Sequence, residues 1–235
     1  MRQRIAALAL FLFILVLQSA CAGSPAHRLA IPTAIDAVSS PEWAVDMQRF
    51  AAQDAVMPPP RHPIVFTGSS SIRLWDTLAG DFPNVPVLNR GFGGSQLRDA
   101  FQHADAIAIR YQPRQVVLYA GDNELSAGRT PQQILADFRA VVARFRHDLP
   151  NTTIIFISPK PSPSRAHLLG AQRVANALIH KEAARMGRVA YADVFTPMLD
   201  ASGQPRVELF AADGLHVNRA SYVLWQTTIA PFLLP

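Results

Sequence analysis

The chain has 235 residues and a formal net charge of +5 at pH 7, with 49% hydrophobic and 17% charged residues. This composition excludes a disordered, collagen-like or disulfide-rich protein, and the length suits one α/β domain. The arginines are scattered without a basic run, so no nucleic-acid-binding surface is expected. The single cysteine, Cys21, allows neither an intrachain disulfide nor a cysteine-based zinc site.

The N-terminus has the features of an export signal. Two arginines precede residues 5–17, which carry no polar side chain and are too few to span a bilayer. We therefore expect a signal peptide over residues 1–22. Cleavage within Ala20-Cys21-Ala22 would release a soluble protein. The segment Gln18-Ser19-Ala20-Cys21 is also similar to a bacterial lipobox, in which Cys21 would be lipidated, although Gln18 stands where that motif usually has leucine.

An uncleaved N-terminal anchor is a third alternative for the same segment. In each case the protein is exported, and we expect it in the periplasm or anchored by lipid to the outer membrane. Residues 23–40 are rich in alanine, serine and proline, and are expected to form a flexible tether. A single domain is expected over residues 41–235. It starts with a helix capped by Ser40, in which we interpret Trp43 as a packing residue.

Short apolar runs then alternate with helical patterns, which predicts a three-layer α/β sandwich around a parallel sheet. The runs are continuously apolar, as is typical of strands buried on both faces. They occupy residues 64–66, 85–88, 116–119, 154–157 and 189–191. The clearest helix begins at Thr130-Pro131, where Gln133 completes a capping box. Further helices are expected over residues 164–186 and 219–229.

Polar or glycine-rich segments follow four of these strands, and ligands bind at this edge of parallel sheets. The segments cover residues 67–71, 89–95, 120–124 and 213–216. They supply a serine, close-approach glycines, an amide and an Asp/His pair, which together are the parts of an acyl-transfer site. Each part alone has a plainer interpretation as a helix cap, a tight turn or a surface turn. The joint occurrence at the strand ends favours catalysis.

These segments resemble the four sequence blocks of the SGNH, or GDSL-type, hydrolase superfamily, over roughly residues 63–232. The resemblance implies a flavodoxin-like sheet of five parallel strands flanked by helices. It also implies that Ser70 is the nucleophile, with His216 as its base and Asp213 orienting the histidine. The implied oxyanion hole consists of the N–H groups of Ser70 and Gly94 and the side-chain amide of Asn123.

Two segments, VLNRGFGGSQ and VVLYAGDNEL, look most like the catalytic subunits of platelet-activating-factor acetylhydrolases, which implies a short-acyl ester substrate. The chain departs from the superfamily at Ser69, in place of the aspartate of Gly-Asp-Ser, and at Glu124, in place of the aspartate of Gly-x-Asn-Asp. Both changes are expected to affect loop geometry rather than the reaction class. Because Ser69, Ser70 and Ser71 are consecutive, the nucleophile is uncertain by one residue, and Ser70 is preferred.

The expected function is therefore that of an exported serine esterase acting on acetyl or other short-chain esters of small molecules, glycans or lipids. No metal and no organic cofactor is implied, and contact with a membrane would come only through the N-terminal lipid. The same residues could serve an O-acyltransferase. A catalytically silent envelope lipoprotein that binds glycan or protein is the alternative from another class. The nucleophile elbow of α/β-hydrolases, Gly-x-Ser-x-Gly, does not occur in the sequence.

Overall fold

The computed structural model describes residues 41–235; the expected signal peptide, the lipidation candidate Cys21 and the tether lie outside this part. At its centre is one sheet of five parallel strands in the order β2-β1-β3-β4-β5, as the resemblance implied. The strands are β1 (Ile64–Gly68), β2 (Val87–Gly91), β3 (Gln115–Tyr119), β4 (Thr153–Ile157) and β5 (Val189–Ala192). The order reverses between β1 and β3, so the loops that follow these two strands open the crevice where ligands bind in such sheets.

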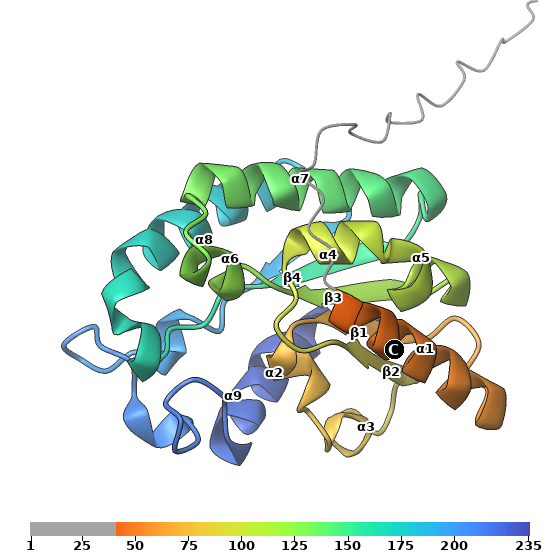
Figure 1. Cartoon of the computed structure of the whole chain (residues 1–235), viewed down its shortest axis with the longest axis horizontal. Coiled ribbons are helices and arrows are strands. Elements are labelled where there is room, and N and C mark those ends of the chain that lie inside the picture. Colours follow the sequence, from red (N-terminus) through yellow and green to blue (C-terminus); the bar gives the residue numbers. More distant parts are fainter. Residues whose placement is uncertain (1–40) are drawn as a thin grey trace, which may run out of the picture.

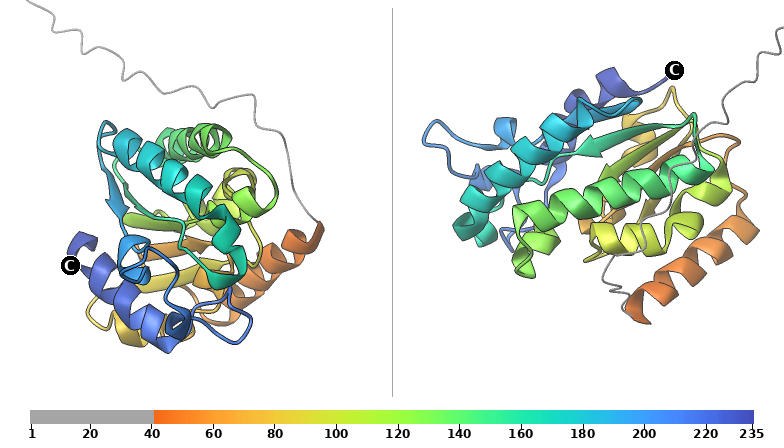
Figure 2. Two further views of the ribbon diagram at one scale, coloured as in Figure 1. Left: turned by 90° about the vertical axis from the view of Figure 1, so that its left-hand side faces the viewer. Right: turned by 90° about the horizontal axis from the view of Figure 1, so that it is seen from above.

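Helices cover both faces of the sheet, which makes three layers (Figures 1 and 2). One face is covered by α1 (Pro41–Val56), α4 (Leu97–Gln102), α5 (Ala104–Ile107), α7 (Pro131–Asp148) and α8 (Leu169–Ala183). The other face is covered by α2 (Ser70–Arg73), α3 (Leu78–Asp81) and α9 (Arg219–Ile229), while the short α6 (Asp122–Ser126) follows β3 directly. In these described residues, no helix is both long and apolar enough to cross a membrane.

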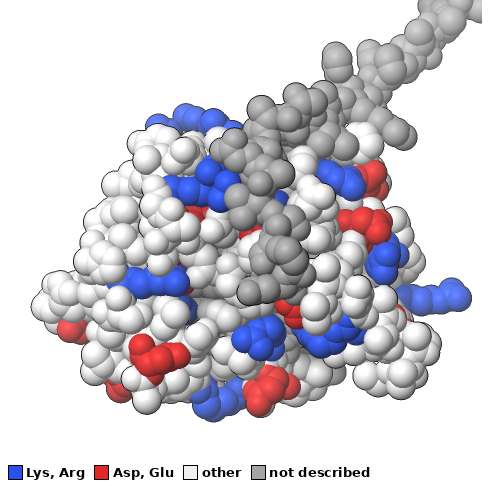
Figure 3. All heavy atoms as spheres, viewed as in Figure 1, with Lys and Arg blue, Asp and Glu red and all other residues white. Residues whose placement is uncertain are grey.

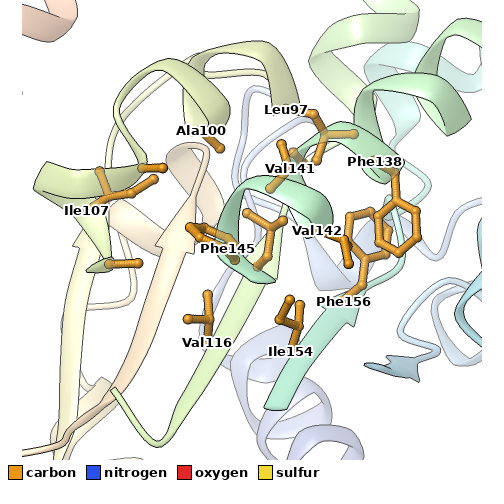
Figure 4. Close-up of a cluster of buried hydrophobic side chains, with 14 of the residues drawn as sticks. Leu97, Ala100, Ile107, Val116, Phe138, Val141, Val142, Phe145, Ile154 and Phe156 are labelled. Carbon is orange, nitrogen blue, oxygen red and sulfur yellow. The ribbon is translucent and has the colours of Figure 1, made fainter. Parts of the chain in front are cut away.

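Both faces of the sheet are buried, which explains why the strand sequences are continuously apolar. On the α7 side, Val116, Ile154 and Phe156 of the strands pack against Phe138 and Phe145 of the helix (Figure 4). On the opposite side the core is aromatic, with stacked and edge-on contacts among Trp75, Tyr222 and Trp225. Burying one apolar side chain of this kind contributes roughly 1.5–3 kcal/mol to the stability of the folded state. The aromatic cluster holds α2 and α9, the two helices nearest the candidate site, against the sheet.

Several elements have the bounds that the sequence predicts. Helix α9 covers residues 219–229 as expected. The capping box of α7 is also confirmed, because the Thr130 hydroxyl accepts from the Gln133 N–H and the Gln133 side chain accepts from the Thr130 N–H. The edge strand β2 begins later than predicted, at residue 87. Pro86, within the predicted run, has no N–H to donate to a strand ladder.

The helix expected over residues 164–186 is wrong in its first turns. Residues Pro163–Leu168 form a 3-10 helix, and α8 begins only at Leu169 and ends at Ala183. Arg165 interrupts the 3-10 segment with a φ of −119° and a ψ of 24°. Its guanidinium bonds the buried carboxylate of Asp122 at 3.0 Å. A tertiary contact therefore replaces the helical conformation that the local pattern predicts.

The charged side chains of the described face do not form a single patch. Figure 3 shows Lys and Arg side chains spread over this face, with Asp and Glu side chains between them.

Candidate active site

The sharp turn after β1 presents Ser70 to solvent. Gly68 has a φ of +120°, and a Cβ at this position would lie 1.8 Å from the carbonyl oxygen of Tyr119, so only glycine fits. Ser69 then donates its N–H to the same carbonyl at 3.1 Å and caps α2, with no side-chain cap bond. Ser69 and Ser71 are buried, at 1% and 2% exposure, whereas Ser70 is partly exposed. Of the three consecutive serines, Ser70 alone is both exposed and in contact with His216.

The loop before α9 brings a histidine and an aspartate to Ser70. Nε2 of His216 lies 3.1 Å from Oγ of Ser70, and Nδ1 lies 2.6 Å from Oδ2 of Asp213. An ionised carboxylate only accepts hydrogen bonds, so Nδ1 carries the proton and the free pair of Nε2 faces the serine hydroxyl. This arrangement places a base next to a hydroxyl, with the base oriented by a third group.

The aspartate is itself held by the backbone of its own loop. Oδ1 of Asp213 accepts the N–H groups of Leu215 and His216, both at 2.9 Å. The hydrogen bond to the His216 ring and these two N–H donors lower the pKa of Asp213 well below its usual range. The carboxylate therefore stays ionised throughout the physiological pH range and keeps the imidazole in one tautomer.

An ion pair between a half-exposed arginine and a buried aspartate joins this loop to the nucleophile side of the site. Arg219, three residues after His216, donates to both carboxylate oxygens of Asp81 at 2.6 Å each. Asp81 also accepts from the indole of Trp75 at 2.6 Å and from the hydroxyl of Thr77 at 2.8 Å. These bonds, led by the one from Arg219, lower the pKa of Asp81 to about 2. The start of α9 is thus fixed to the segment that follows α2.

Asn123 lies in the first turn of α6, beyond the end of β3. Its Nδ2 donates to the carbonyl of Ser95 at 3.0 Å, and its Oδ1 accepts from Nη1 of Arg165 at 3.1 Å. A guanidinium only donates and a carbonyl only accepts, so the two contacts define which amide atom is nitrogen. One amide hydrogen of Asn123 is used by Ser95, which directly follows Gly94. The second hydrogen has no acceptor among the described residues.

A buried charge cluster supports this asparagine, and no sequence motif indicated it. Asp122, fully buried, bonds Nζ of Lys160 at 3.2 Å and Arg165 at 3.0 Å. Burial raises the pKa of this carboxyl, but the two cations outweigh burial and lower it below its ordinary value. Lys160 and Arg165 follow β4, a strand end that was not predicted to contribute to the site. Its position at the same sheet edge was the available signal.

Glu124 joins two loops of the site. Its Oε2 accepts the N–H of Gly121 at 2.8 Å and its Oε1 accepts the N–H of Leu97 at 2.6 Å. The side chain is fully buried, and burial raises the pKa of Glu124 to about 7. As the sequence predicts, this departure from the superfamily concerns loop geometry, because the carboxylate bonds backbone N–H groups of two loops.

Gly94 lies in an exposed turn after β2, with a φ of +76° that favours glycine. Neither its N–H nor that of Ser70 has an acceptor within residues 41–235. The part of the chain that the structure describes also contains no group of three His, Cys, Asp or Glu side chains arranged for a metal ion. Ser70, His216 and these two N–H groups supply a hydroxyl, a base and unpaired donors, which acyl transfer requires.

Comparisons with known proteins identify the family of this chain. The model of the GDSL-like lipase/acylhydrolase family matches residues 65–224. A comparison with curated proteins found no match. A solved structure from Streptococcus pneumonia, provisionally described as a platelet activating factor, has a TM-score of 0.73 and 20% identity, and the match covers 82% of this chain and 93% of that one.

Two further solved structures share the fold. A GDSL-like lipase from Bacteroides thetaiotaomicron VPI-5482 has a TM-score of 0.67 and 18% identity, covering 79% of this chain and 96% of that one. An acetylxylan esterase from Geobacillus stearothermophilus, solved as a catalytic mutant, has a TM-score of 0.59 and 14% identity, and the match covers 74% of this chain and 95% of that one. The family match spans more than half of the chain, from β1 into α9, and the chain belongs to the GDSL-like lipase/acylhydrolase family of ester-hydrolysing enzymes.

Proposed function

We propose that the protein is a serine esterase in which Ser70, His216 and Asp213 form the catalytic triad. The hydrogen-bonded chain from the Ser70 hydroxyl through the His216 ring to the Asp213 carboxylate carries this proposal. Ser70 Oγ attacks the ester carbonyl carbon while His216 Nε2 takes its proton. His216 then returns that proton to the leaving alcohol, and a water molecule hydrolyses the acyl-enzyme by the same route.

The negative charge that develops on the carbonyl oxygen needs donors, and three are proposed. They are the N–H groups of Ser70 and Gly94 and the free amide hydrogen of Asn123. All three lack an acceptor among the described residues, which supports this role. Because Arg165 withdraws electrons from the Asn123 carbonyl oxygen, the amide N–H becomes a stronger donor.

The proposed substrates are esters of acetyl or other short acyl groups. The resemblance of the segments VLNRGFGGSQ and VVLYAGDNEL to platelet-activating-factor acetylhydrolases supports this. The acetylxylan esterase among the structural neighbours is consistent with an acetylated glycan as one such substrate. The export signal expected at the N-terminus would bring the enzyme to acylated glycans or lipids of the cell envelope.

A fluorophosphonate probe tests the proposal, because it phosphonylates only a serine that a base has activated. We expect mass spectrometry to find the probe on Ser70, and Ser70→Ala to abolish both labelling and hydrolysis of p-nitrophenyl acetate. Ser69→Ala is the matched control, because the Ser69 hydroxyl makes no cap bond. Labelling of a neighbouring serine, or undiminished turnover in Ser70→Ala, would reject the triad.

A further inference from the structure

A tryptophan of the N-terminal helix bonds the loop that carries Gly94. Trp43 lies in the first turn of α1 and is 7% exposed. Its indole Nε1 donates to the carbonyl oxygen of Gly93 at 3.0 Å. The ring also meets Phe92 edge-on, with 6.2 Å between the ring centroids. The family match begins at residue 65, so this contact comes from a helix outside the matched region.

The Gly93 carbonyl and the Gly94 N–H belong to the same peptide plane. No described peptide bond is cis, so the two groups point in opposite directions. A bond from Trp43 to the carbonyl therefore turns the Gly94 N–H away from α1. Helix α1 packs in the layer on one face of the sheet, whereas α2 and α9 pack on the other (Figures 1 and 2). The proposed oxyanion hole requires the N–H on this second side, the one that carries Ser70 and His216.

This peptide has little resistance of its own to rotation. Both flanking residues are glycines, which lack the Cβ that restricts backbone dihedral angles. The Gly94 N–H has no acceptor among the described residues, so no hydrogen bond on that side holds the plane. The indole bond at Gly93 is the contact that distinguishes the observed orientation from a flipped one, in which the carbonyl would face the substrate.

We infer that Trp43 is a positioning residue for the oxyanion hole, acting through the Gly93–Gly94 peptide. The inference rests on the proposed function, since it assigns the Gly94 N–H to the oxyanion. Accepting a hydrogen bond at the carbonyl also polarises the peptide, which makes its N–H a stronger donor. Helix α1 thus completes the active site without touching the substrate.

The test replaces the donor and keeps the ring. Trp43→Phe removes the indole N–H but leaves an aromatic side chain against Phe92. Losing one oxyanion donor outright costs about 10²–10³ in kcat. Without the indole bond, the Gly93–Gly94 peptide still adopts the productive orientation part of the time. We therefore expect kcat on p-nitrophenyl acetate to fall by less, about ten- to 100-fold. KM should stay within about threefold, because a neutral carbonyl gains less from the donor than the oxyanion does.

Two further variants separate positioning from packing. The tryptophan isostere 3-benzothienylalanine at position 43 carries sulfur in place of the N–H and should lower kcat as Trp43→Phe does. Phe50→Leu loosens the packing of α1, where Phe50 is 1% exposed, but leaves the bond to Gly93 in place. We expect Phe50→Leu to lower the melting temperature and to keep kcat within about twofold of wild type.

The outcomes distinguish this inference from the proposed function. If wild-type turnover depends on Ser70 but both position-43 variants keep kcat within about twofold, the positioning role is wrong and the esterase proposal stands. An equal loss of kcat in Phe50→Leu would likewise overturn it, since loosened packing alone would then explain the effect. If the wild type shows no Ser70-dependent turnover, both proposals fail together.

Discussion

The side chain of Asn123 offers a direct measure of oxyanion stabilisation, because the other two proposed donors are backbone groups. Asn123→Ala removes the amide hydrogen that remains free after the bond to Ser95. Losing one such donor costs about 2.7–4 kcal/mol of transition-state stabilisation, or about 10²–10³ in kcat. We expect a loss in this range with KM changed by no more than a few-fold, since ground-state binding depends little on this donor.

The surroundings of Asn123 indicate that its loss leaves the fold intact. Arg165 keeps its 3.0 Å bond to Asp122, and Asn123 is partly exposed, so water can reach the Ser95 carbonyl. The cost in unfolding free energy is therefore about 1 kcal/mol, the value of one ordinary hydrogen bond. Asn176→Ala is the matched control, because Asn176 also donates its amide to a backbone carbonyl, that of Pro159, at 3.1 Å.

The assay is steady-state hydrolysis of p-nitrophenyl acetate, with thermal unfolding of each variant measured in the same buffer. A second substitution, Asn123→Asp, keeps an acceptor for Arg165 but removes the donor and adds a negative charge, so its kcat should be no higher than that of Asn123→Ala. The oxyanion assignment is refuted if Asn123→Ala retains kcat within tenfold of wild type, a margin of about 1.4 kcal/mol. It is equally refuted if Asn176→Ala loses as much kcat.

Three further results are expected. Glu124, with a pKa raised from 4.5 to about 7, binds its proton more tightly in the folded than in the unfolded protein, so its contribution to stability is full below pH 4.5 and is lost as the pH rises through 7. Denaturant titrations should show the stability advantage of wild type over Glu124→Gln shrinking by about 3 kcal/mol from low to neutral pH. A constant difference would contradict the raised pKa. Arg219→Ala should lower the unfolding free energy at pH 7 by about 1–2 kcal/mol, a value reduced because the arginine is half exposed. Since the pKa of Asp81 is lowered to about 2, the difference in unfolding free energy between wild type and Arg219→Ala should close as the pH falls from about 4 toward 2. A difference that persists at pH 2 would contradict the ion pair. Across p-nitrophenyl esters, kcat/KM should be higher for acetate and butyrate than for palmitate, as the resemblance of VLNRGFGGSQ and VVLYAGDNEL to short-acyl esterases implies. A preference for chains of about twelve carbons or more would reject the short-acyl substrate.

Local sequence patterns were sufficient for most of the secondary structure. The continuously apolar runs of β1, β3 and β4 reflect burial on both faces, and each run falls within the observed strand. The capping box at Thr130 and the bounds of α9 follow from contacts between residues three or four positions apart, which a sequence displays directly. The candidate residues Ser70, Asn123 and His216 were also identifiable, because their functional groups are few and stand just after predicted strands or in the loop before α9.

The contacts that orient these groups were decided only by the tertiary structure. The choice among three consecutive serines depends on which hydroxyl meets His216, a residue 146 positions away. The bond from Trp43 to Gly93 spans 50 positions, and the bonds from Arg165 to α6 span 42 and 43. Periodicity and capping rules describe forces between near neighbours, so they contain no information about such pairs. Only the folded sheet, which gathers the strand ends at one edge, brings these side chains within hydrogen-bonding distance.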